Sequence, residues 1–389
     1  MNECHVCIVS SVHPPFDVRI FHKEARSLIK GGYNVTFLVP HERDEIKSGV
    51  KISHLQRHKK RLIRMIVIPV RIFFYIIIMR PRIVHFHDPE LLPACVITKF
   101  FLNCKIIYDV HENVCAQILN KDWIKLSLRK IIAKIYHITE RIFIPFVDYI
   151  ILAEESYESI YKQYGINYKV IRNYPILSYF CSDGKESNNF HDDSEKFYLI
   201  YVGGITVERG VFELIKSIKI IKDNGIKKIV LILVGPMYPL ELEKEVRKTL
   251  EEYDLVENVL LYGVEDYSKI EKLLSKSMVG LCVLHPIPNY IDSLPTKLFE
   301  YMAAGLPVIA SDFPAWRKIV DKVKCGLLVD PLNPKEIADA INYLINHPEK
   351  AEIMGNHGRE AVNNIYNWEK EEKALLQLYN ELAKSYIDT

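Results

Sequence analysis

Hydrophobic residues in this chain occur in two kinds of segment. Short runs of β-branched and aromatic residues, such as residues 34–39, are typical of buried strands. Between them lie longer segments in which apolar residues recur at three- and four-residue steps, as at 121–143, and these predict amphipathic helices. Because the alternation runs through both halves of the chain, it predicts an α/β protein built on parallel sheets.

The expected elements form two series. In the first half, strands are expected at residues 4–10, 34–39, 82–86, 104–110 and 149–153, with helices at 19–31, 59–79 and 121–143. In the second half, strands are expected at 197–202, 228–234, 259–262, 279–283, 307–310 and 326–329, with helices at 210–223, 239–252, 267–275, 295–304, 314–320 and 334–346. The tail, residues 368–385, is expected to form one more amphipathic helix.

A polar break separates the two series. Residues 182–196 are polar and acidic and lack a hydrophobic period, which is typical of a linker or loop. We therefore expect two Rossmann-like, doubly wound domains at residues 1–172 and 197–366, a linker at 173–196, and a helix at 367–389 that packs back toward the first domain. Ligands of such sheets bind beyond the carboxyl ends of the strands, so a cleft between the domains is the expected site.

Charge changes the picture in one segment. The formal net charge is only +2, which indicates no global electrostatic partner and no nucleic acid. Between residues 51 and 87, however, there are nine Lys or Arg and no Asp or Glu. Since Arg64, Pro69 and Arg71 interrupt the apolar run, we expect residues 57–82 to lie on an anionic membrane surface rather than to span it. Docking onto the sheet of the first domain is the alternative.

The long helix at 121–143 carries charge as well. We expect it to pack mostly in the core, with a solvent-exposed face formed by Lys125, Arg129, Lys130 and Lys134.

The eight cysteines are scattered, and the N-terminus runs directly into a strand-like segment. We expect no secretory leader and hence reduced thiols. Cys4 and Cys7 have the spacing of half a zinc site, but no second pair completes it, and we interpret both as core thiols. Together with the basic segment, this predicts a cytoplasmic protein bound peripherally to the inner face of the cell membrane.

The strongest candidate for chemistry is Asp292-Ser-Leu-Pro-Thr-Lys-Leu-Phe-Glu300, followed by Tyr-Met-Ala-Ala-Gly-Leu-Pro-Val-Ile-Ala-Ser. It has the form of a helix start, in which Ser293 or its neighbour is expected to cap and Pro295 suits the first turn. Unpaired N–H groups at a helix N-terminus bind anions, and Lys297 adds a full positive charge. Glu300, one turn further on, is placed to accept hydrogen bonds from two ribose hydroxyls.

This stretch resembles the signature of the GT4 family of retaining glycosyltransferases, which have the GT-B fold. Both share two acidic residues separated by seven others, followed by Ala-x-Gly-x-Pro-Val-Ile-Ala-Ser. The resemblance covers nearly the whole chain through further anchors at residues 11–19, 84–88, 108–112, 201–210 and 234–236. It implies that the first domain takes the acceptor and that the second takes the nucleotide-sugar donor.

The resemblance also implies donor-site roles for individual residues. Glu300 matches the acid that holds the donor ribose, and Asp292, where many members have Glu, matches the acid that sits against the donor sugar. Arg209 matches the basic residue that contacts the diphosphate. Gly204 stands where many members carry a second diphosphate Arg, and Lys297 is the expected substitute. The implied donor set is completed by Ser293 and Leu294.

On the side of the first domain, His111 matches the family histidine that contacts the transferred sugar near the reacting carbon. With Asp292 it forms the implied catalytic pair. Five further residues are expected on the acceptor side or in the cleft: His13, Asp17, Arg19, His87 and Asp88. Because the chain has no Asp-x-Asp motif, we expect no metal and no cofactor. Arg209, Lys297 and helix N–H groups would then stabilise the leaving phosphate.

These features predict a hexosyltransferase that acts with retention on a nucleotide-diphosphate sugar. The expected acceptor is a saccharide, lipid-linked, in surface polysaccharide or lipopolysaccharide assembly. A sugar-nucleotide epimerase of the same fold is one alternative, and a non-catalytic membrane-bound relative, suggested by Gly204 alone, is another. A metal-dependent hydrolase would use His85, His87, Asp88 and His111. The two histidines share a strand face, but the sequence shows no third ligand at metal spacing.

Overall fold

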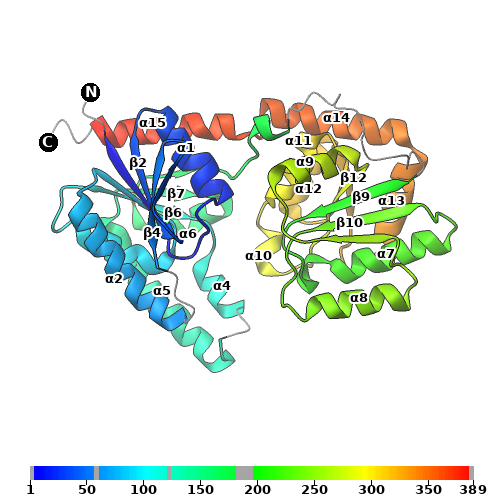
Figure 1. Cartoon of the computed structure of the whole chain (residues 1–389), viewed down its shortest axis with the longest axis horizontal. Helices are drawn as coiled ribbons and strands as arrows, with labels where there is room; N and C mark the ends of the chain where they lie inside the picture. The colour runs from blue at the N-terminus through cyan, green and yellow to red at the C-terminus, as the bar shows by residue number, and fades with distance from the viewer. Residues whose placement is uncertain (1–3, 57–60, 121–123, 181–195, 385–389) are drawn as a thin grey trace. The chain divides into compact units, whose positions relative to one another are not determined.

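The computed structural model describes residues 4–56, 61–120, 124–180 and 196–384. The chain divides into two compact units, one formed by residues 1–173 with 368–389 and one by residues 174–367. Each unit is a sheet dominated by parallel strands with helices on its faces (Figure 1), which confirms the predicted fold class. Of the expected linker, residues 181–195 lie outside the described residues, and Leu177–Tyr179 form a short 3-10 turn, η6.

The first unit contains eight strands in the order β3-β4-β2-β1-β5-β6-β7-β8, and every neighbouring pair is parallel except β3 with β4. Strands β1, β5 and β6 are almost wholly buried, as expected for a parallel sheet covered on both faces. The strands are β1 (His5–Val9), β2 (Asn34–Pro40), β3 (Glu45–Lys47), β4 (Val50–Leu55), β5 (Ile83–Phe86), β6 (Lys105–Val110), β7 (Tyr149–Leu152) and β8 (Tyr168–Val170).

The sequence pattern missed β3, β4 and β8. Two of them have three residues each, and β4 alternates buried and exposed positions, as a strand near the edge of a sheet does. These strands extend the two edges of the sheet, and the central strands are where they were expected.

The helices of the first unit begin with η1, a π-helix, whose first N–H groups are capped by the Asp17 carboxylate. Helix α15 is tied to this unit at both ends: the Trp368 indole donates to Ser27 at 3.0 Å, and the Tyr33 hydroxyl donates to Asn380 at 2.7 Å. The helices are η1 (Val18–Ala25), α1 (Arg26–Lys30), α2 (Arg61–Met79), η2 (Pro89–Leu91), α3 (Leu92–Thr98), α4 (Val114–Asn120), α5 (Leu126–Phe143), η3 (Ile144–Phe146), η4 (Glu155–Tyr157), α6 (Glu158–Tyr161), η5 (Lys162–Tyr164) and α15 (Trp368–Lys384).

Helices α2 and α5 differ from the sequence expectation. One face of α2 docks into the core of this unit through Ile68, Ile72 and Ile76, and its other face is exposed. The expectation that α5 is mostly core packing is wrong, because its apolar stripe is 45–58% exposed. The stripe consists of Leu128, Ile131, Ile135, Ile138 and Ile142. The helix packs through its opposite face, where Ala133 and Glu140 are buried.

The second unit contains six parallel strands in the order β11-β10-β9-β12-β13-β14. Its strands are β9 (Phe197–Val202), β10 (Ile229–Val234), β11 (Val259–Tyr262), β12 (Val279–Cys282), β13 (Val308–Ser311) and β14 (Gly326–Val329). Its helices are η7 (Val207–Arg209), α7 (Val211–Asp223), α8 (Leu242–Glu252), α9 (Tyr267–Lys276), α10 (Pro288–Ile291), α11 (Thr296–Ala304), α12 (Pro314–Val323), α13 (Pro334–Asn346) and α14 (Pro348–Asn364).

The sequence pattern missed α14, which packs against α11. Its buried positions are Ala351, Gly355, Gly358 and Val362, spaced as one helical face but occupied mostly by small residues. Large apolar residues, which the periodicity argument follows, are scarce on that face. Within the described residues, none of the helices combines the length and the hydropathy needed to cross a bilayer.

Candidate functional site

Two residues of the second unit that are expected to bind the donor, Arg209 and Lys297, lie where its strand order reverses. Strands β9 and β12 are neighbours although two strands lie between them in the sequence, and ligands of doubly wound sheets bind at such a switch point. The chain leaves β9 at Gly203 and Gly204, whereas α11 lies between β12 and β13 in the sequence.

Two cations converge over the backbone that follows β9. The Lys297 side chain is only 7% exposed, its Nζ has no hydrogen-bond partner, and it lies 3.7 Å from the centre of the Tyr201 ring. Arg209 donates from Nη1 to the Gly204 carbonyl at 3.2 Å and from Nε to the Tyr290 hydroxyl at 3.2 Å. A Cβ atom on Gly203, which has a φ of +125°, would lie 3.3 Å from Lys297 Nζ and 3.7 Å from Arg209 Nη1.

No carboxylate of the described residues forms an ion pair with either cation, Lys297 or Arg209. Burial, reinforced by Arg209, lowers the pKa of Lys297 to about 7, against the opposing effects of Cys282 and Glu300. Since an isolated buried cation is costly, the arrangement favours an anion in this place.

The start of α11 differs from the expectation in its cap. The N-cap is Pro295, and no side chain caps the helix, so the expected cap by Ser293 is wrong. The Ser293 carbonyl instead accepts a hydrogen bond from Trp316 Nε1, and Leu294 packs partly against the core of this unit. The first-turn N–H groups of α11 therefore have no side-chain cap to displace, which suits an anion.

The two acidic residues of the signature occupy different environments. Glu300 is half-buried one turn after Lys297, and its Oε1 accepts a hydrogen bond from the Tyr267 hydroxyl at 3.1 Å. Asp292 is exposed at the end of α10 and makes no hydrogen bond or ion pair in the part of the chain that the structure describes. Gly204 has no side chain, and Arg209 occupies the space beside it. Arg209 Nη1 lies 3.2 Å from where a Cβ atom of residue 204 would be.

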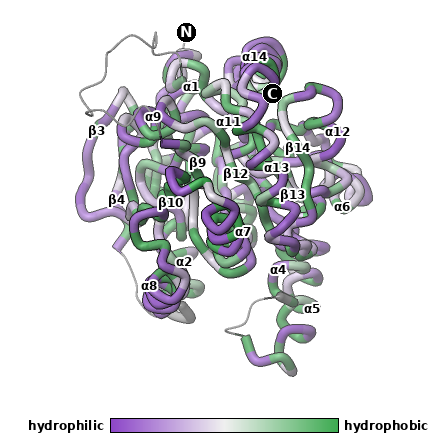
Figure 2. The backbone as a smooth tube through the Cα atoms, turned by 90° about the vertical axis from the view of Figure 1, so that its right-hand side faces the viewer, coloured by the Kyte–Doolittle hydropathy of each residue, from purple (hydrophilic) through white to green (hydrophobic). Residues whose placement is uncertain are grey.

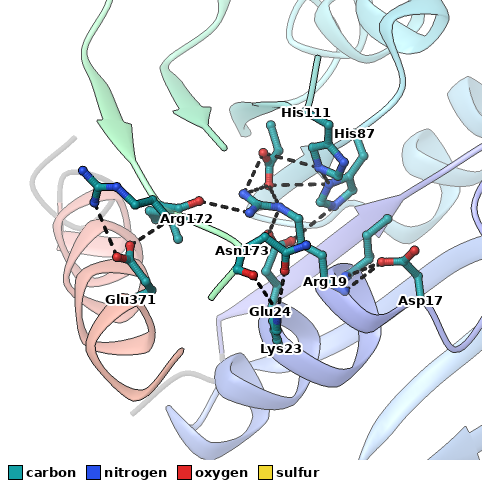
Figure 3. Close-up of polar contacts among 12 residues, drawn as sticks. Asp17, Arg19, Lys23, Glu24, His87, His111, Arg172, Asn173 and Glu371 are labelled. Atoms are coloured by element: carbon teal, nitrogen blue, oxygen red, sulfur yellow. Dashed lines mark hydrogen bonds and ion pairs between the residues drawn. The ribbon is translucent and has the colours of Figure 1, made fainter. Parts of the chain in front are cut away.

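The structure also brings together the candidate residues of the first unit, at the carboxyl ends of β1, β5 and β6, and Figure 3 labels Asp17, Arg19, His87 and His111 among them. His13 Nδ1 lies 3.1 Å from the Asp17 carboxylate, and His87 Nδ1 lies 3.1 Å from His111 Nε2. Asp88 accepts hydrogen bonds from the Ser10 hydroxyl and the Ser11 N–H. The strands thus place His13, Asp17, Arg19, His87, Asp88 and His111 in one network.

Beneath these residues lies a buried ion cluster. Arg19 donates to both oxygens of Asp109 at 2.9–3.2 Å, and its Nε lies 3.0 Å from Glu24 Oε1. Burial disfavours both carboxylates, but Arg19 and His111 hold the pKa of Asp109 well below its usual range. Burial and the neighbouring Asp109 raise the pKa of Glu24 well above its usual range. The two carboxylates around Arg19 are thus shifted in opposite directions, and Asp109 is the one that more readily carries the negative charge.

Sequence reasoning missed Glu24 and Asp109. Asp109 lies within the anchor at residues 108–112, two residues before His111, but a strand position alone does not reveal a buried ion pair. Glu24 carries no signal, because its role depends on the fold bringing η1 against β6. Of the network, His13, Asp17 and His111 keep side chains that are 29%, 21% and 20% exposed, whereas Arg19, Glu24 and Asp109 are 5% exposed or less.

One argument against a metal site does not hold. The sequence showed no third ligand for His85 and His87, yet Glu24 and Asp109 bring ligand atoms within 4.8 Å of both histidines. All four side chains are buried, and Arg19 already supplies a positive charge to the two carboxylates.

Neighbouring groups also shift the pKa values of His13 and Asp17, which lie at the more exposed side of this network. Burial opposes ionisation of Asp17, but the hydrogen bond and charge of His13 outweigh it and lower the pKa of Asp17 to about 2. Burial likewise opposes charge on His13, but Asp17 and Asp88 raise the pKa of His13 above its ordinary value. His13 and Asp17 therefore form a partly exposed ion pair beside His111 at mildly acidic pH.

Comparison with known proteins shows that part of the chain is similar to a family. Residues 183–361 match the family described as glycosyl transferases group 1. A capsular polysaccharide biosynthesis glycosyltransferase of Staphylococcus aureus, CapM, is 25% identical over 224 residues, which is 54% of this chain and 56% of that protein. The chain spans about half the length of this and another curated relative that it matches.

Solved structures share the fold over almost the whole chain. Sucrose-phosphate synthase from Thermosynechococcus elongatus superposes with a TM-score of 0.79 at 18% identity, covering 98% of this chain and 99% of the other. The Anabaena protein HepE, crystallised with UDP-glucose, superposes with a TM-score of 0.72 at 13% identity, covering 97% of this chain and 99% of the other. The chain therefore has the GT-B fold, and residues 183–361, which lie within its second unit, are similar to the glycosyl transferases group 1.

Proposed function

We propose that this protein is a retaining glycosyltransferase of the GT4 type, which transfers a sugar from a nucleotide-diphosphate sugar to a saccharide acceptor. The observation that carries the proposal is the buried, unpaired ammonium of Lys297 beside Arg209, at the switch point of the sheet that matches the family. A diphosphate is an anion that would accept hydrogen bonds from both cations and from the uncapped start of α11.

The proposed chemistry follows from this arrangement. When the bond between the sugar and the diphosphate breaks, negative charge grows on the leaving phosphate, and preorganised cations in a desolvated place stabilise it. Glu300 would hold the ribose, and Asp292 and His111 would contact the transferred sugar. We propose domain roles to match, with residues 1–172 taking the acceptor, 197–366 the donor, and 367–389 completing the first domain. We also propose that the reaction needs neither metal nor cofactor.

Observations on two other proteins support the proposed donor class and the proposed role of the product. HepE, which shares the fold, was crystallised with UDP-glucose, and CapM is named for capsular polysaccharide biosynthesis. For this chain we propose a UDP-sugar or a related nucleotide sugar as donor. As acceptor we propose a lipid-linked saccharide in surface polysaccharide or lipopolysaccharide assembly.

A membrane-bound acceptor requires the enzyme to reach the lipid surface. Residues 61–82 of the basic segment are described, and α2 exposes Ile66, Val70, Phe74 and Ile78 on the face opposite its docked side. Residues 57–60 lie outside the described residues. We propose that the segment of residues 57–82, through the exposed face of α2, contacts an anionic membrane on the cytoplasmic side.

The test of the donor site is thermal stabilisation by a panel of nucleotide sugars, because a ligand that binds the folded protein raises its melting temperature. We expect one nucleotide diphosphate class to stabilise the wild type and to lose this effect in Glu300→Ala. Transfer to a lipid-linked acceptor in the presence of a strong chelator, with the anomer read by NMR, then tests metal independence and retention. Unchanged binding and turnover in Glu300→Ala would reject the site.

The alternatives make different predictions. An epimerase would convert the donor into another nucleotide sugar without an acceptor. A hydrolase built on His85 and His87 would have to admit substrate to side chains that are 0–3% exposed, so the structure offers it no support.

A further inference from the structure

The surface that the proposed function does not use is the outer face of α5. Eight large apolar side chains of α5 and its following turn are 36–77% exposed. They are Leu126, Leu128, Ile131, Ile132, Ile135, Ile138, Ile142 and Phe146. Isolated exposed apolar residues are ordinary, but a continuous stripe along a helix marks a surface that something covers.

The contacts of this helix show how little of it belongs to the core. Helix α5 packs with α4, and the small hydrophobic cluster between them has only three buried members, Ile118, Ile124 and Ala133. The lower end of the α4–α5 pair extends beyond the sheet in Figure 1, and Figure 2 shows hydrophobic and hydrophilic stretches alternating along α5.

Charge identifies the partner of the stripe. Leu128, Ile131, Ile135, Ile138 and Ile142 recur at alternating three- and four-residue steps, so they share one face. The polar positions of the helix and its cap carry cations: Lys125, Arg129, Lys130, Lys134 and Arg141. The one carboxylate within the described bounds of α5, Glu140, is 4% exposed and bonded to the Tyr161 hydroxyl. An apolar stripe bordered by cations without exposed anions matches the interface of an anionic bilayer.

The same charges argue against a helix of a second copy of this chain as the partner of the stripe. A stripe with this repeat can also pair with a helix of a second copy, as in a coiled coil. Such pairing would place the flanking cations of one copy near those of the other, with no exposed carboxylate of α5 to neutralise them. An anionic lipid surface neutralises them all.

The apolar surface is also continuous with α2. The Phe146 ring lies 6.0 Å from that of Phe100, and the Phe101 ring lies 5.7 Å from that of Phe73 on α2. Phe100 and Phe101 are 70% and 66% exposed. Aromatic side chains thus connect the end of α5 with the face of α2 that the proposed function already assigns to the membrane.

We infer that the outer face of α5 is a membrane-insertion surface, in which its apolar stripe enters the acyl boundary of an anionic bilayer and the flanking cations bind phospholipid headgroups. The inference extends the membrane contact proposed for residues 57–82 and does not depend on the sugar-transfer reaction.

The test is flotation of the full chain with vesicles of phosphatidylcholine alone or mixed with phosphatidylglycerol. We expect binding to the mixed vesicles, and a loss of about tenfold or more in partition for Ile131→Gln/Ile135→Gln, since each inserted side chain contributes on the order of 1 kcal/mol. Lys130→Gln/Lys134→Gln should weaken binding to mixed vesicles only. The matched control is Ile353→Gln, which changes an isolated isoleucine of the second unit that is 54% exposed.

Four outcomes would overturn the inference: no vesicle binding by the wild type; equal binding by the Ile131→Gln/Ile135→Gln variant; loss only in Ile66→Gln/Ile78→Gln on α2; or a wild-type dimer by light scattering that the α5 variant abolishes. Because all these side chains are exposed, circular dichroism melting should be unchanged. Binding of a UDP-sugar without vesicles is measured on the same samples. It should be equal in wild type and α5 variants, so its absence would count against the proposed function and not against the membrane-insertion surface.

Discussion

The two units build polar sites at equivalent places of similar sheets, but they balance charge in opposite ways. In the first unit, Arg19 is buried against Asp109 and Glu24, so its charge is matched within the protein. In the second unit, Lys297 is almost as deeply buried, and its ammonium has no hydrogen-bond partner. The first arrangement is satisfied within the protein, whereas the second, on the function proposed above, is complete only when an anion binds.

The difference has a thermodynamic consequence. A buried pair that is broken leaves an uncompensated charge and is costly, whereas a buried cation without a partner is already costly and its removal relieves the folded state. Substitutions in the two units should therefore have opposite effects on stability. A comparison of these substitutions should also distinguish effects on stability from effects on ligand binding.

The largest effect is expected for Arg19→Met. It leaves Asp109 and Glu24 buried without a cation, and we expect a loss of about 3–5 kcal/mol in the stability of the first unit. Arg19→Lys keeps the charge but not the forked geometry, and its loss should be smaller. Hydrogen exchange of peptides from β1, β5 and β6 measures the effect unit by unit. Wild-type exchange in Arg19→Met would show that the cluster does not depend on its guanidinium.

The second largest effect is expected for Lys297→Met. We expect a roughly 100-fold loss in kcat/KM for sugar transfer, because one preorganised charge on the leaving phosphate is removed. The free second unit should at the same time become more stable, since a desolvated ammonium is replaced by a thioether. Melting curves with and without UDP-glucose measure both effects. Lys216→Met, which changes an exposed lysine of α7, is the control and should alter neither.

A pH dependence should follow from the same lysine. Its pKa is lowered from 10.5 to about 7 in the folded second unit, so between these values the unfolded chain binds a proton that the folded unit does not. The stability of the free unit should therefore rise with pH above about 7. Donor affinity should fall over the same window, by up to about tenfold per pH unit, because binding must restore the proton. Titrations of UDP-glucose between neutral and alkaline pH should show this slope in the wild type, and a flat profile in Lys297→Met.

The contrast between the units also explains what the sequence could reveal. Central strands and most helices were predicted because large apolar residues recur with a clear period, as in β9 and α7. The signature from Asp292 to Glu300 singled out Lys297, which the structure places beside Gly203 at the switch point. It could not show that Lys297 is buried, because depth depends on how α11 packs against Gly280 of β12, where a Cβ would lie 2.3 Å from the Tyr301 ring.

The sequence also did not predict the exposure of the α5 stripe or the buried pair of Glu24 and Asp109, for a different reason. The stripe of α5 has the period of a core helix, and periodicity cannot tell an apolar face that meets the core from one that meets another partner. Glu24 and Asp109 carry ordinary sequence contexts, and only the fold makes them a coupled pair. The hydrophobic pattern thus predicts which faces of a helix are apolar, but only the three-dimensional packing determines what each face contacts.

The smallest effects come from a matched pair of hydroxyls, one in each unit. The Tyr379 hydroxyl lies 2.8 Å from His85 Nδ1 in the buried network, and the Tyr267 hydroxyl donates to Glu300 at 3.1 Å in the half-buried site. Tyr379→Phe leaves a buried ring nitrogen unpaired and should cost about 1–3 kcal/mol of stability, with no change in UDP-glucose affinity. Tyr267→Phe removes a bond to a carboxylate that water can replace, so it should weaken UDP-glucose binding a few-fold and cost little stability. Isothermal titration measures the affinity of both variants, and chemical denaturation measures their stability. If Tyr267→Phe changes only stability and Tyr379→Phe changes only affinity, the two assignments are wrong. The ligand site would then lie at the Tyr379 network, and the structural network at Tyr267.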